Sequence, residues 1–379
     1  MKVIFERQPL AGGLSLIQNI VNASSTMPIL ANVLIEAGAG ETTVFGTDLD
    51  SFGRVSLKAQ VEEAGRITVN ARLLGDIVRL MPAGDITMES TGTQLSITGG
   101  RNQFSMATMP SEDFPDWPQM EPDTTITLKQ KDLKRILHNT TFAIPTRDPR
   151  KVLMGVLFDL AEGRLTCVAT DGRKLGKTTV EPVAVTGTAT SQAILPERIL
   201  DEIDKAIGEE GEIELALSER QARFTLDNLC YISSRLVGTY PRYEAVIPQS
   251  FKRTIKIQKT TLADAINRAA VVAERRHHST MLRFSRGQIE ILAQSAEEGT
   301  YEGVVEVDYD GEPFRLAFNH QYLQEIFKIT PDAVIDLKIK DVNAPVVFEC
   351  ESDPDSLFLV MPVRVSDMEE ADQEPIEAH

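Results

Sequence analysis

One local pattern recurs three times along this chain of 379 residues. The pattern is an apolar strand, a helix, two or three strands, a second helix and a closing group of strands. Its markers on the first helix, the second helix and the last strand are Leu10, Leu133 and Leu262; Leu73, Ile199 and Leu323; and Pro110, Pro241 and Pro362. Successive members of each set lie about 125 residues apart, whereas solenoid units have only about 20–50 residues. Because a self-sufficient domain commonly has about 100–150 residues, this interval predicts three tandem, similar domains.

The predicted domain boundaries lie where the pattern restarts. The first link, residues 111–123, is rich in Pro and Asp, and the second lies near residues 247–250. Such composition favours extended, non-helical connections. We therefore expect domains at residues 1–122, 123–250 and 251–365. The remaining residues, 366–379, hold six carboxylates and no Lys or Arg, which predicts a disordered acidic tail.

Each predicted helix carries apolar residues four positions apart, which places them on one helix face. The pairs on the first helices are Leu10 and Leu14, Leu133 and Leu137, and Leu262 and Ile266. The pairs on the second helices are Leu73 and Ile77, Ile199 and Ile203, and Leu323 and Phe327. Alternating strand segments, such as residues 44–48 and 164–168, lie between and after them. A sheet with helices on one side only predicts an α+β fold.

Composition excludes several classes of protein and site. The chain has no apolar run of 18 or more residues, so it offers no membrane span. Its first ten residues lack the apolar core of a signal peptide, so we expect a cytoplasmic protein. Cys167, Cys230 and Cys350 are scattered among apolar strand residues, without CxxC spacing or a His-rich cluster. This predicts buried free thiols, no metal site and no cofactor.

Basic residues recur at corresponding helix positions although the net charge is −17. Arg72 and Arg79 are seven residues apart in the first domain, and Arg198 and Lys205 match them 126 residues later. An ordinary solvated helix face is one explanation of this stripe. The other is a polyanionic partner, because phosphate contacts need only a local positive surface.

The remaining helices extend the basic pattern in part. On the first helix of the second domain, Lys131, Arg135 and His138 point away from the apolar face. In the third domain Tyr322 stands at the first matching position, and Lys328 comes one residue before the second. The third domain is therefore expected to have a weaker basic face.

Two aspartates, Asp48 and Asp171, each follow a threonine at the end of an apolar strand, 123 residues apart. Paired carboxylates could serve acid–base chemistry in a hydrolase or transferase. Because equivalent residues of separate domains lie far apart, a turn in which Asp accepts backbone N–H bonds is favoured instead. The sequence contains no nucleophile elbow, no phosphate-binding glycine loop and no HExxH motif, so we expect no catalytic residues.

Seven segments carry a likeness to one family. They are MPILANVLIEA (27–37), FGTDLD (45–50), FSMATMPSEDFP (104–115), LMGVLFD (153–159), VATDGRKL (168–175), SSRLVGTYPRYEAVIP (233–248) and VMPVRV (360–365). Together they resemble the bacterial replicative sliding clamps, the beta subunits of DNA polymerase III, from Met1 to about Val365. The resemblance implies three domains of the DNA clamp fold, with helices lining the inside and sheets outside. It also implies that two chains join head to tail into a six-domain ring.

The family's role implies a processivity factor for DNA replication with no active site of its own. The implied partners are a second copy of the chain, encircled double-stranded DNA, the clamp loader, the DNA polymerase III catalytic subunit, and other polymerases and repair proteins with clamp-binding peptides. A ring linked to duplex DNA needs only sparse, sequence-blind phosphate contacts, which let it slide. The alternative to a clamp is a three-domain adaptor that binds proteins and never encircles DNA.

The resemblance and the helix register assign residues to three surfaces. The residues expected to face DNA are Arg72, Arg79, Lys131, Arg135, Arg147, Arg150, Arg198 and Lys205. The peptide-docking cleft, between the second and third domains, would comprise Leu153, Thr170, Gly172, Arg173, Lys174, Leu175, Pro241, Val246, Tyr322, Val360, Met361, Pro362 and Val363. The dimer interface would join Arg101, Phe104 and Met106 of one chain to Val271, Val272, Glu297 and Glu298 of the other. The cleft's apolar floor suits Leu or Phe anchors, and its rim cations suit acidic residues.

The sequence departs from the family pattern in three respects. Ser24 and Ala245 stand where relatives commonly have basic residues, and relatives commonly end near Val365. The acidic tail starts close to the strand that forms the cleft. We therefore hypothesise that residues 366–379 compete weakly with partner peptides.

Overall fold

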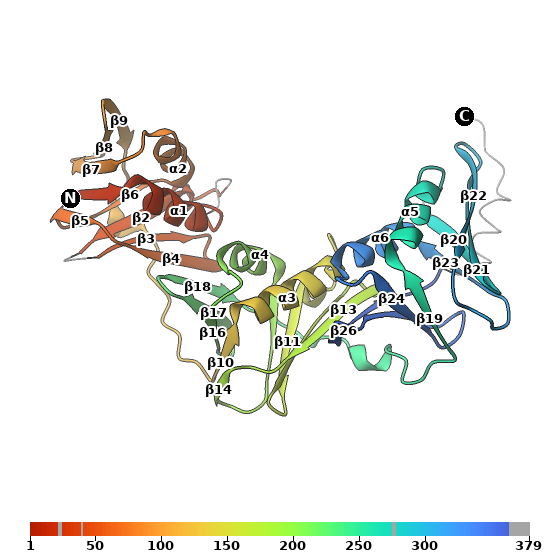
Figure 1. Cartoon of the computed structure of the whole chain (residues 1–379). Coiled ribbons are helices and arrows are strands. Elements are labelled where there is room, and N and C mark those ends of the chain that lie inside the picture. The colour runs from red at the N-terminus through yellow and green to blue at the C-terminus, as the bar shows by residue number, and fades with distance from the viewer. Residues whose placement is uncertain (22–24, 39–40, 275–277, 364–379) are drawn as a thin grey trace. The chain divides into compact units, whose positions relative to one another are not determined.

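The computed structural model describes residues 1–21, 25–38, 41–274 and 278–363, and its elements repeat three times (Figure 1). The first repeat contains β1 (Lys2–Glu6), α1 (Arg7–Ile17), β2 (Asn32–Ala37), β3 (Thr42–Thr47), β4 (Ser51–Leu57), β5 (Gln60–Glu63), β6 (Gly65–Asn70), α2 (Ala71–Leu80), β7 (Asp85–Thr91), β8 (Gln94–Gly99) and β9 (Asn102–Ala107). The second contains β10 (Thr124–Lys129), α3 (Gln130–Thr140), β11 (Gly155–Ala161), β12 (Arg164–Thr170), β13 (Lys174–Val180), β14 (Ala184–Gly187), β15 (Ser191–Pro196), α4 (Glu197–Ala206), β16 (Glu212–Leu217), β17 (Gln221–Leu226) and β18 (Leu229–Ser234). The third contains β19 (Arg253–Gln258), α5 (Lys259–Ala270), β20 (Ser279–Ser285), β21 (Gln288–Ser295), β22 (Gly299–Glu306), β23 (Phe314–Asn319), α6 (His320–Ile329), β24 (Val334–Ile339), β25 (Val346–Cys350) and β26 (Asp353–Val360). The predicted α+β fold with a threefold repeat is confirmed.

The packing does not follow the repeats one by one. Residues 1–134, 159–163 and 181–237 form one compact unit, and residues 135–158, 164–180 and those from 238 onward form a second. The middle repeat is divided because its strands pair with strands of both neighbours. The limits of the three domains remain a prediction from the sequence.

The first unit contains two sheets. One has the strand order β5-β1-β7-β8-β9. The other has nine strands, β14-β10-β16-β17-β18-β4-β3-β2-β6, and joins the first and second repeats where β18 pairs with β4. This pairing is antiparallel and runs from Ser51 opposite Ser233 to Val55 opposite Leu229. We call it the first joint.

The second unit contains the corresponding joint. Six adjacent strands of an eight-stranded sheet, in the order β12-β13-β26-β25-β24-β19, join the second and third repeats where β13 pairs with β26. The antiparallel register runs from Lys174 opposite Val360 to Thr178 opposite Ser356. We call this the second joint. A separate sheet, β22-β21-β20-β23, completes the third repeat and leaves β22 on its edge.

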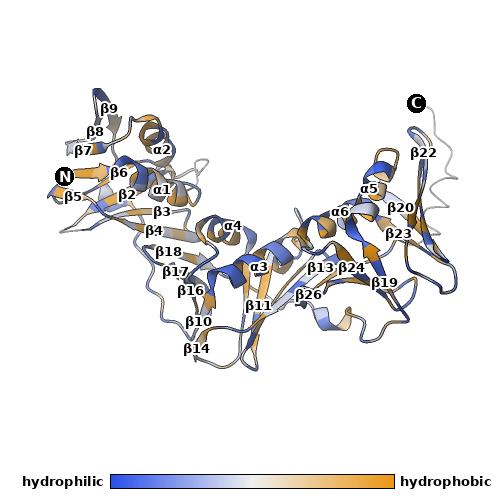
Figure 2. Cartoon of the chain, viewed as in Figure 1, coloured by the Kyte–Doolittle hydropathy of each residue, from blue (hydrophilic) through white to orange (hydrophobic). Residues whose placement is uncertain are grey.

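The first helices pack as their apolar spacing predicts. Leu10, Leu133 and Leu262 are each no more than 1% exposed. Helix α1 contacts α2, β3 and β4, and α5 contacts α6, β21 and β22. Each of these helix pairs therefore covers one side of its sheets, while hydrophilic residues take the other helix faces, as the blue stretches of α3 show (Figure 2).

The second helices correct one marker. Helices α2, α4 and α6 are each ten residues long, so residues at the same distance from the helix start are equivalent. On this alignment Leu323 matches Leu74 and Leu200, and all three are buried. Leu73, predicted to face the core, is 50% exposed. That prediction was wrong by one residue, since the buried face of α2 consists of Ala71, Leu74, Ile77 and Val78.

The same alignment corrects the cations of the third repeat. Lys328 is the ninth residue of α6, as Arg79 is of α2 and Lys205 of α4, so it is in register. Gln321, and not Tyr322, stands where the first two repeats have arginine. The sequence comparison had shifted the third helix by one residue because it aligned the wrong leucine.

Other predictions meet the structure directly. Cys167, Cys230 and Cys350 are buried and free, and burial raises the pKa of the Cys350 thiol to about 11. Within the described ranges no helix is long and apolar enough to cross a membrane, and no cluster of His, Cys, Asp or Glu could hold a metal ion. Ser24 and the tail, 366–379, lie outside the described residues, so the tail hypothesis stays a prediction.

Candidate functional site: an apolar pocket and the cationic helices

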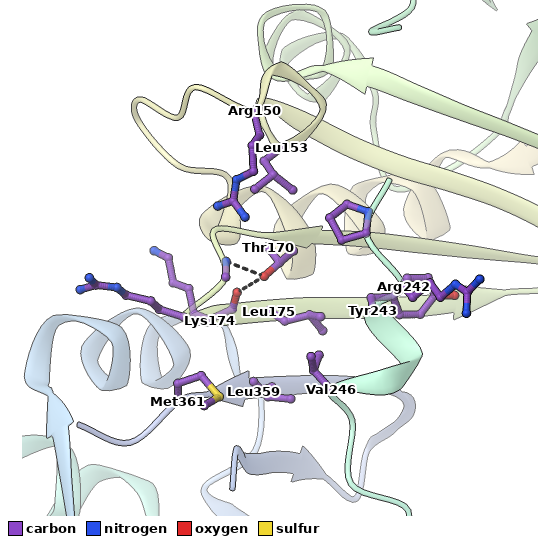
Figure 3. A pocket seen from close by; sticks show the side chains of 13 residues that line it. Arg150, Leu153, Thr170, Lys174, Leu175, Arg242, Tyr243, Val246, Leu359 and Met361 are labelled. Atoms are coloured by element: carbon purple, nitrogen blue, oxygen red, sulfur yellow. Dashed lines mark hydrogen bonds between the residues drawn. The ribbon is translucent and has the colours of Figure 1, made fainter. Parts of the chain in front are cut away.

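A pocket opens beside the second joint (Figure 3). Its volume is about 520 Å³, including the space at its open mouth. Its walls come from β13, β26, the turn before β13 and the chain that leads toward the third repeat. The lining residues are Arg150, Leu153, Thr170, Gly172, Arg173, Lys174, Leu175, Pro241, Arg242, Tyr243, Val246, Leu359 and Met361.

The pocket floor is apolar because paired strands place leucines side by side. Leu175 of β13 lies opposite Leu359 of β26, and Leu153 lies at the end of a short 3-10 helix, Lys151–Leu153. These three leucines are each no more than 2% exposed. Val246 is 48% exposed and gives the pocket an apolar wall that solvent can reach. Such a surface can bury apolar side chains of a ligand.

A tight turn presents the residues at one end of the floor. The Asp171 Oδ1 atom accepts hydrogen bonds from the backbone N–H groups of Arg173 (2.7 Å) and Lys174 (2.8 Å). The Thr170 hydroxyl donates to the Lys174 carbonyl (2.7 Å) and accepts from the Gly172 N–H (3.0 Å), as Figure 3 shows. The aspartate therefore acts as a turn residue, as predicted.

Asp48 has the same role in the first repeat. Its Oδ1 atom accepts from the N–H groups of Asp50 (3.1 Å) and Ser51 (2.7 Å). In the third repeat the hydroxyl of Ser295 takes this place and accepts from the N–H groups of Glu297 (3.3 Å) and Glu298 (3.4 Å). The turn is therefore a feature of the repeat and not part of an acid–base pair.

Cations surround the apolar floor. The Arg150 guanidinium donates to both carboxylate oxygens of Asp148, at 2.9 and 2.8 Å. These hydrogen bonds lower the pKa of the Asp148 carboxyl to about 2. Lys174 is paired with Glu325, and its ammonium lies 5.2 Å from the centre of the Tyr322 ring. The pocket thus combines an apolar base with a positively charged surround.

The structure brings together most of the residues that the resemblance assigned to a docking cleft. Nine of them line the pocket: Leu153, Thr170, Gly172, Arg173, Lys174, Leu175, Pro241, Val246 and Met361. Tyr322, Pro362 and Val363 do not line it, although Tyr322 contacts Lys174 as described above. Val360 is fully buried and belongs to the core of the third repeat.

Sequence reasoning missed Arg150 as a pocket residue, together with Arg242, Tyr243 and Leu359. Leu359 could have been found from strand alternation, because residues 359 and 361 share a face and residue 360 points the other way. Arg150 had been assigned to DNA by the family resemblance and the helix register.

The equivalent place at the first joint is filled. Phe114 is buried in a cluster with Ile29, Leu30 and Leu34. Trp117 packs edge-on against Phe45 and Phe52, with ring centroids 5.8 and 6.3 Å away. The Arg54 guanidinium lies 4.7 Å from the centre of the Trp117 ring. The chain leaving the first repeat therefore covers its own joint.

The eight cations expected to face DNA divide into three groups. Arg72, Lys131 and Arg147 are exposed and have no ion-pair partner among the described residues. Arg79 pairs with Asp76 of the same helix at 2.6 Å, and Arg150 belongs to the pocket. Arg135, Arg198 and Lys205 are each bound to a carboxylate that is largely buried.

Two of those pairs lie at the joints. The Arg135 guanidinium of α3 donates to Asp353 at 2.5 Å, and Asn139 donates to the same carboxylate at 3.0 Å. Arg198 of α4 donates to the carboxylate of Asp48. These arginines tie a helix of the middle repeat to its neighbour.

Arg198 also binds the end of α1. Its Nη2 atom donates to the backbone carbonyls of Asn19 (3.2 Å) and Ile20 (2.9 Å). The last carbonyls of a helix lack intrahelical partners and attract cations. Asn19 and Ile20 lie in the turn just after α1, so Arg198 binds the chain where it leaves a neighbouring helix, and this contact occupies the side chain.

Helix α4 is less positive than its two cations suggest. Lys205 pairs with the buried Glu202 at 2.6 Å, and the helix also carries Glu197, Asp201 and Asp204. Burial raises the pKa of both the Glu197 and Asp201 carboxyls above the ordinary value. The sequence prediction counted the cations of this helix without these acids.

The residues predicted for the dimer interface lie on two sheet edges and one helix end. Phe104 of the edge strand β9 is 42% exposed, whereas Met106 is buried in its own repeat at 4%. Val271, just after α5, is 75% exposed. Arg101, Glu297 and Glu298 are also exposed, and Val272 is half-buried. Because its side chain is buried, Met106 can contribute to an interface only through its backbone, as part of β9.

Comparison with known proteins assigns the three repeats of the chain to three domains of one family. Residues 1–118, 127–242 and 244–364 match the N-terminal, central and C-terminal domains of the DNA polymerase III beta subunit. The "Beta sliding clamp" of Proteus mirabilis is 30% identical over 371 residues, covering 96% of this chain and 100% of that protein.

Solved structures give the same result. A sliding clamp from Pseudomonas aeruginosa bound to griselimycin matches with a TM-score of 0.93 at 27% identity. One from Bartonella birtlesii bound to griselimycin matches with a TM-score of 0.92 at 30% identity. Each match covers 96% of this chain and 100% of the other.

Proposed function

The chain belongs to the family of bacterial DNA polymerase III beta subunits, the replicative sliding clamps, and from that premise we propose how its own residues close a ring, face DNA and dock partners. The family is a processivity subunit and not an enzyme. The single observation that carries the proposal is the repeated joint. Two joints of one construction lie within the chain. Each pairs the last strand of one repeat with an inner strand of the repeat before it, and one strand of each type is left on a sheet edge.

The leftover edges are β9 and β22. At each internal joint the last strand of one repeat, β18 or β26, pairs with β4 or β13 of the repeat before it. β9 is the last strand of the first repeat, and β22 takes the place of β4 and β13 in the third. We infer that β9 of one chain pairs with β22 of a second chain. Two such joints close a head-to-tail ring.

An aromatic residue supports this joint. The hairpins align Phe104 with Tyr231 and Phe358, and the latter two are each 1% exposed. Only Phe104 of the three lacks a neighbouring repeat in its own chain, and it is 42% exposed. An aromatic ring left open at one equivalent position is an expected interface anchor.

The partner of Phe104 follows from the second joint. Phe358 packs edge-on against Phe142, with ring centroids 6.0 Å apart. Phe142 lies thirteen residues after Lys129, the residue before α3, and Val271 lies thirteen residues after Gln258, the residue before α5. We therefore place Phe104 of one chain against Val271 of the other.

DNA contacts are assigned to the unpaired cations. Among the described residues Lys131 and Arg147 have no ion-pair partner and can meet phosphates, whereas Arg79, Arg135, Arg198 and Lys205 are each paired with a carboxylate that offsets their charge. Few free cations suit a ring that holds DNA by closure and slides along it. Because bacterial DNA is replicated in the cytoplasm, we expect the protein there.

The pocket at the second joint is assigned to partner peptides. Its leucine floor would bind one or two apolar anchors of an extended segment, and Arg173 and Arg242 would attract acidic residues beside them. The replicative polymerase, the clamp loader and repair proteins would then compete for one pocket per chain. Competition at a single site would let one protein replace another on the same ring.

Removing the proposed interface anchors tests the joint. The double variant Phe104→Ala/Val271→Ala should weaken dimerisation by about 2–4 kcal/mol, because both side chains lose apolar contact across the joint. Both are exposed in the single chain, so folding should be unaffected. The control is Val237→Ala, at a side chain 93% exposed and away from both edges. Sedimentation equilibrium that finds the same dimer constant for the double variant and wild type would contradict the joint.

A further inference from the structure

We propose that Arg72 of α2 belongs to the joint between two chains, where it binds backbone carbonyls just after the partner's helix α5, and that it is not a DNA contact. The inference rests on the proposed head-to-tail ring and adds a helix-to-helix contact to it. It follows from the alignment of the second helices, in which Arg72 and Arg198 are both the second residue.

Arg198 shows what this position does when a neighbouring repeat is present. It donates to the carbonyls of Asn19 and Ile20, at the end of α1, and pairs with Asp48 in the turn before β4. Arg72 stands at the same position of its helix but has no partner among the described residues. The repeat that would supply one lies in a second chain.

The carbonyls that Arg72 would bind can be named. Asn19 and Ile20 lie thirteen and fourteen residues after Glu6, the residue before α1. Counting from Gln258 in the third repeat, the same positions are Val271 and Val272. The end of α5 therefore offers two carbonyls in the place that Arg198 occupies in the first joint. A guanidinium suits this place, because the end of a helix carries partial negative charge.

The residue next to Arg72 supports the same contact. Leu73 is equivalent to Ile199, which is fully buried at the first joint, whereas Leu73 is 50% exposed. In both helices an arginine is followed directly by an apolar residue: Arg72 by Leu73, and Arg198 by Ile199. Leu73 and Arg72 thus form a surface that fits a second copy of this chain.

One part of the equivalent contact is missing. Asp48, the acid that Arg198 binds, corresponds to Ser295 in the third repeat. Glu297 and Glu298 follow it in the turn and supply negative charge nearby. The joint between chains therefore has the two carbonyls but lacks the aspartate. Its arginine should be held less firmly than Arg198.

Two substitutions test the inference by dimer constant. Arg72→Gln should raise the dimer dissociation constant about tenfold to a hundredfold, because charge-assisted hydrogen bonds across the joint are lost. Ser295→Asp should lower the constant about threefold to tenfold in low salt, since aspartate already fills this turn position in the other repeats. Lys58→Gln, which removes an exposed charge of the same repeat, is the matched control.

The combined variant makes the result specific. Ser295→Asp should strengthen the dimer when Arg72 is present and have no effect in the Arg72→Gln background. An unchanged dimer constant for Arg72→Gln, or an equal gain from Ser295→Asp in both backgrounds, would overturn the inference and leave the ring intact. A wild-type chain that is monomeric at every concentration would remove the proposed ring and this contact together.

A DNA measurement separates the two roles of Arg72. At concentrations where every variant is dimeric, Arg72→Gln should leave the salt dependence of DNA binding unchanged. Lys131→Gln, at a cation assigned to DNA, should reduce that dependence by about one phosphate contact. A reduced salt dependence for Arg72→Gln with an unaltered dimer constant would return this residue to the DNA surface.

Discussion

The two internal joints share one construction, but the second carries an open pocket, whereas aromatic side chains cover the first. At both, an antiparallel strand pair follows a turn held by an aspartate. At the first joint Phe114 is buried and Trp117 covers Phe52. Val246, the residue that follows the equivalent 3-10 helix at the second joint, is smaller than Phe114 and 48% exposed.

The turn adds a second difference. At the left-handed position of the turn the first joint has Leu49, with φ 81°, and the second has Gly172, with φ 88°. Gly172 carries no side chain into the mouth of the pocket, where Arg150 lies 3.7 Å from the place of a Cβ atom. The comparison teaches that strand pairing does not make a docking site. The chain that leaves each repeat, together with one turn residue, decides whether the joint stays open.

The largest expected effect comes from removing the side chain that fills the first joint. Phe114→Ala should lower the free energy of unfolding by about 3 kcal/mol, because it empties a packed apolar cluster. Val246→Ala, the matched change at the second joint, should cost less than about 0.5 kcal/mol. Chemical denaturation measures both. Equal losses would mean that the two joints do not differ in packing.

Peptide binding should reverse that order. Val246→Asp should weaken binding of a short peptide with Leu and Phe anchors about tenfold, or about 1.4 kcal/mol, because it buries a carboxylate in the apolar wall. Val237→Asp, at a side chain 93% exposed, is the control for added charge. Fluorescence anisotropy with a labelled peptide gives the affinity. Undiminished binding to the Val246→Asp variant would place the docking site elsewhere.

The smallest expected quantity, about 1 kcal/mol, is the difference between the two turn aspartates. Asp48→Asn should cost about 1.5 kcal/mol, because asparagine keeps the turn but loses the ion pair with Arg198. Asp171→Asn should cost less than about 0.5 kcal/mol, because asparagine keeps the turn bonds and Asp171, unlike Asp48, forms no salt bridge among the described residues. Thermal unfolding of the two variants measures the difference. A larger loss for Asp171→Asn would reverse the assignment.

The repeated architecture could be predicted from sequence because periodic apolar positions depend only on local geometry. The first-helix leucines and the turn aspartates were identified correctly, and nine of the residues predicted for the docking cleft line one pocket. Leu73 was misplaced because two leucines, 73 and 74, are adjacent in the helix, so two registers fit the sequence. Only packing against the sheet selects Leu74. The buried state of Val360 required knowing which face of β26 the core covers.

The state of the cations could not be predicted from sequence. Arg135 and Arg198 bind carboxylates that lie about 150 to 220 residues away along the chain, so no local pattern shows the pairing. A helical stripe of basic residues looks the same whether it faces solvent, phosphate or a buried acid. Folding decides among these, because it brings Asp48 and Asp353 to the helices.

The central claim is that the chain closes into a ring through a third joint of the same kind. The most direct measurement is retention on DNA with a clamp loader supplied. Clamps loaded on a nicked circle should stay bound through gel filtration and be released once the circle is cut to a linear duplex. Equal retention on circular and linear DNA, or none on either, would contradict a closed ring.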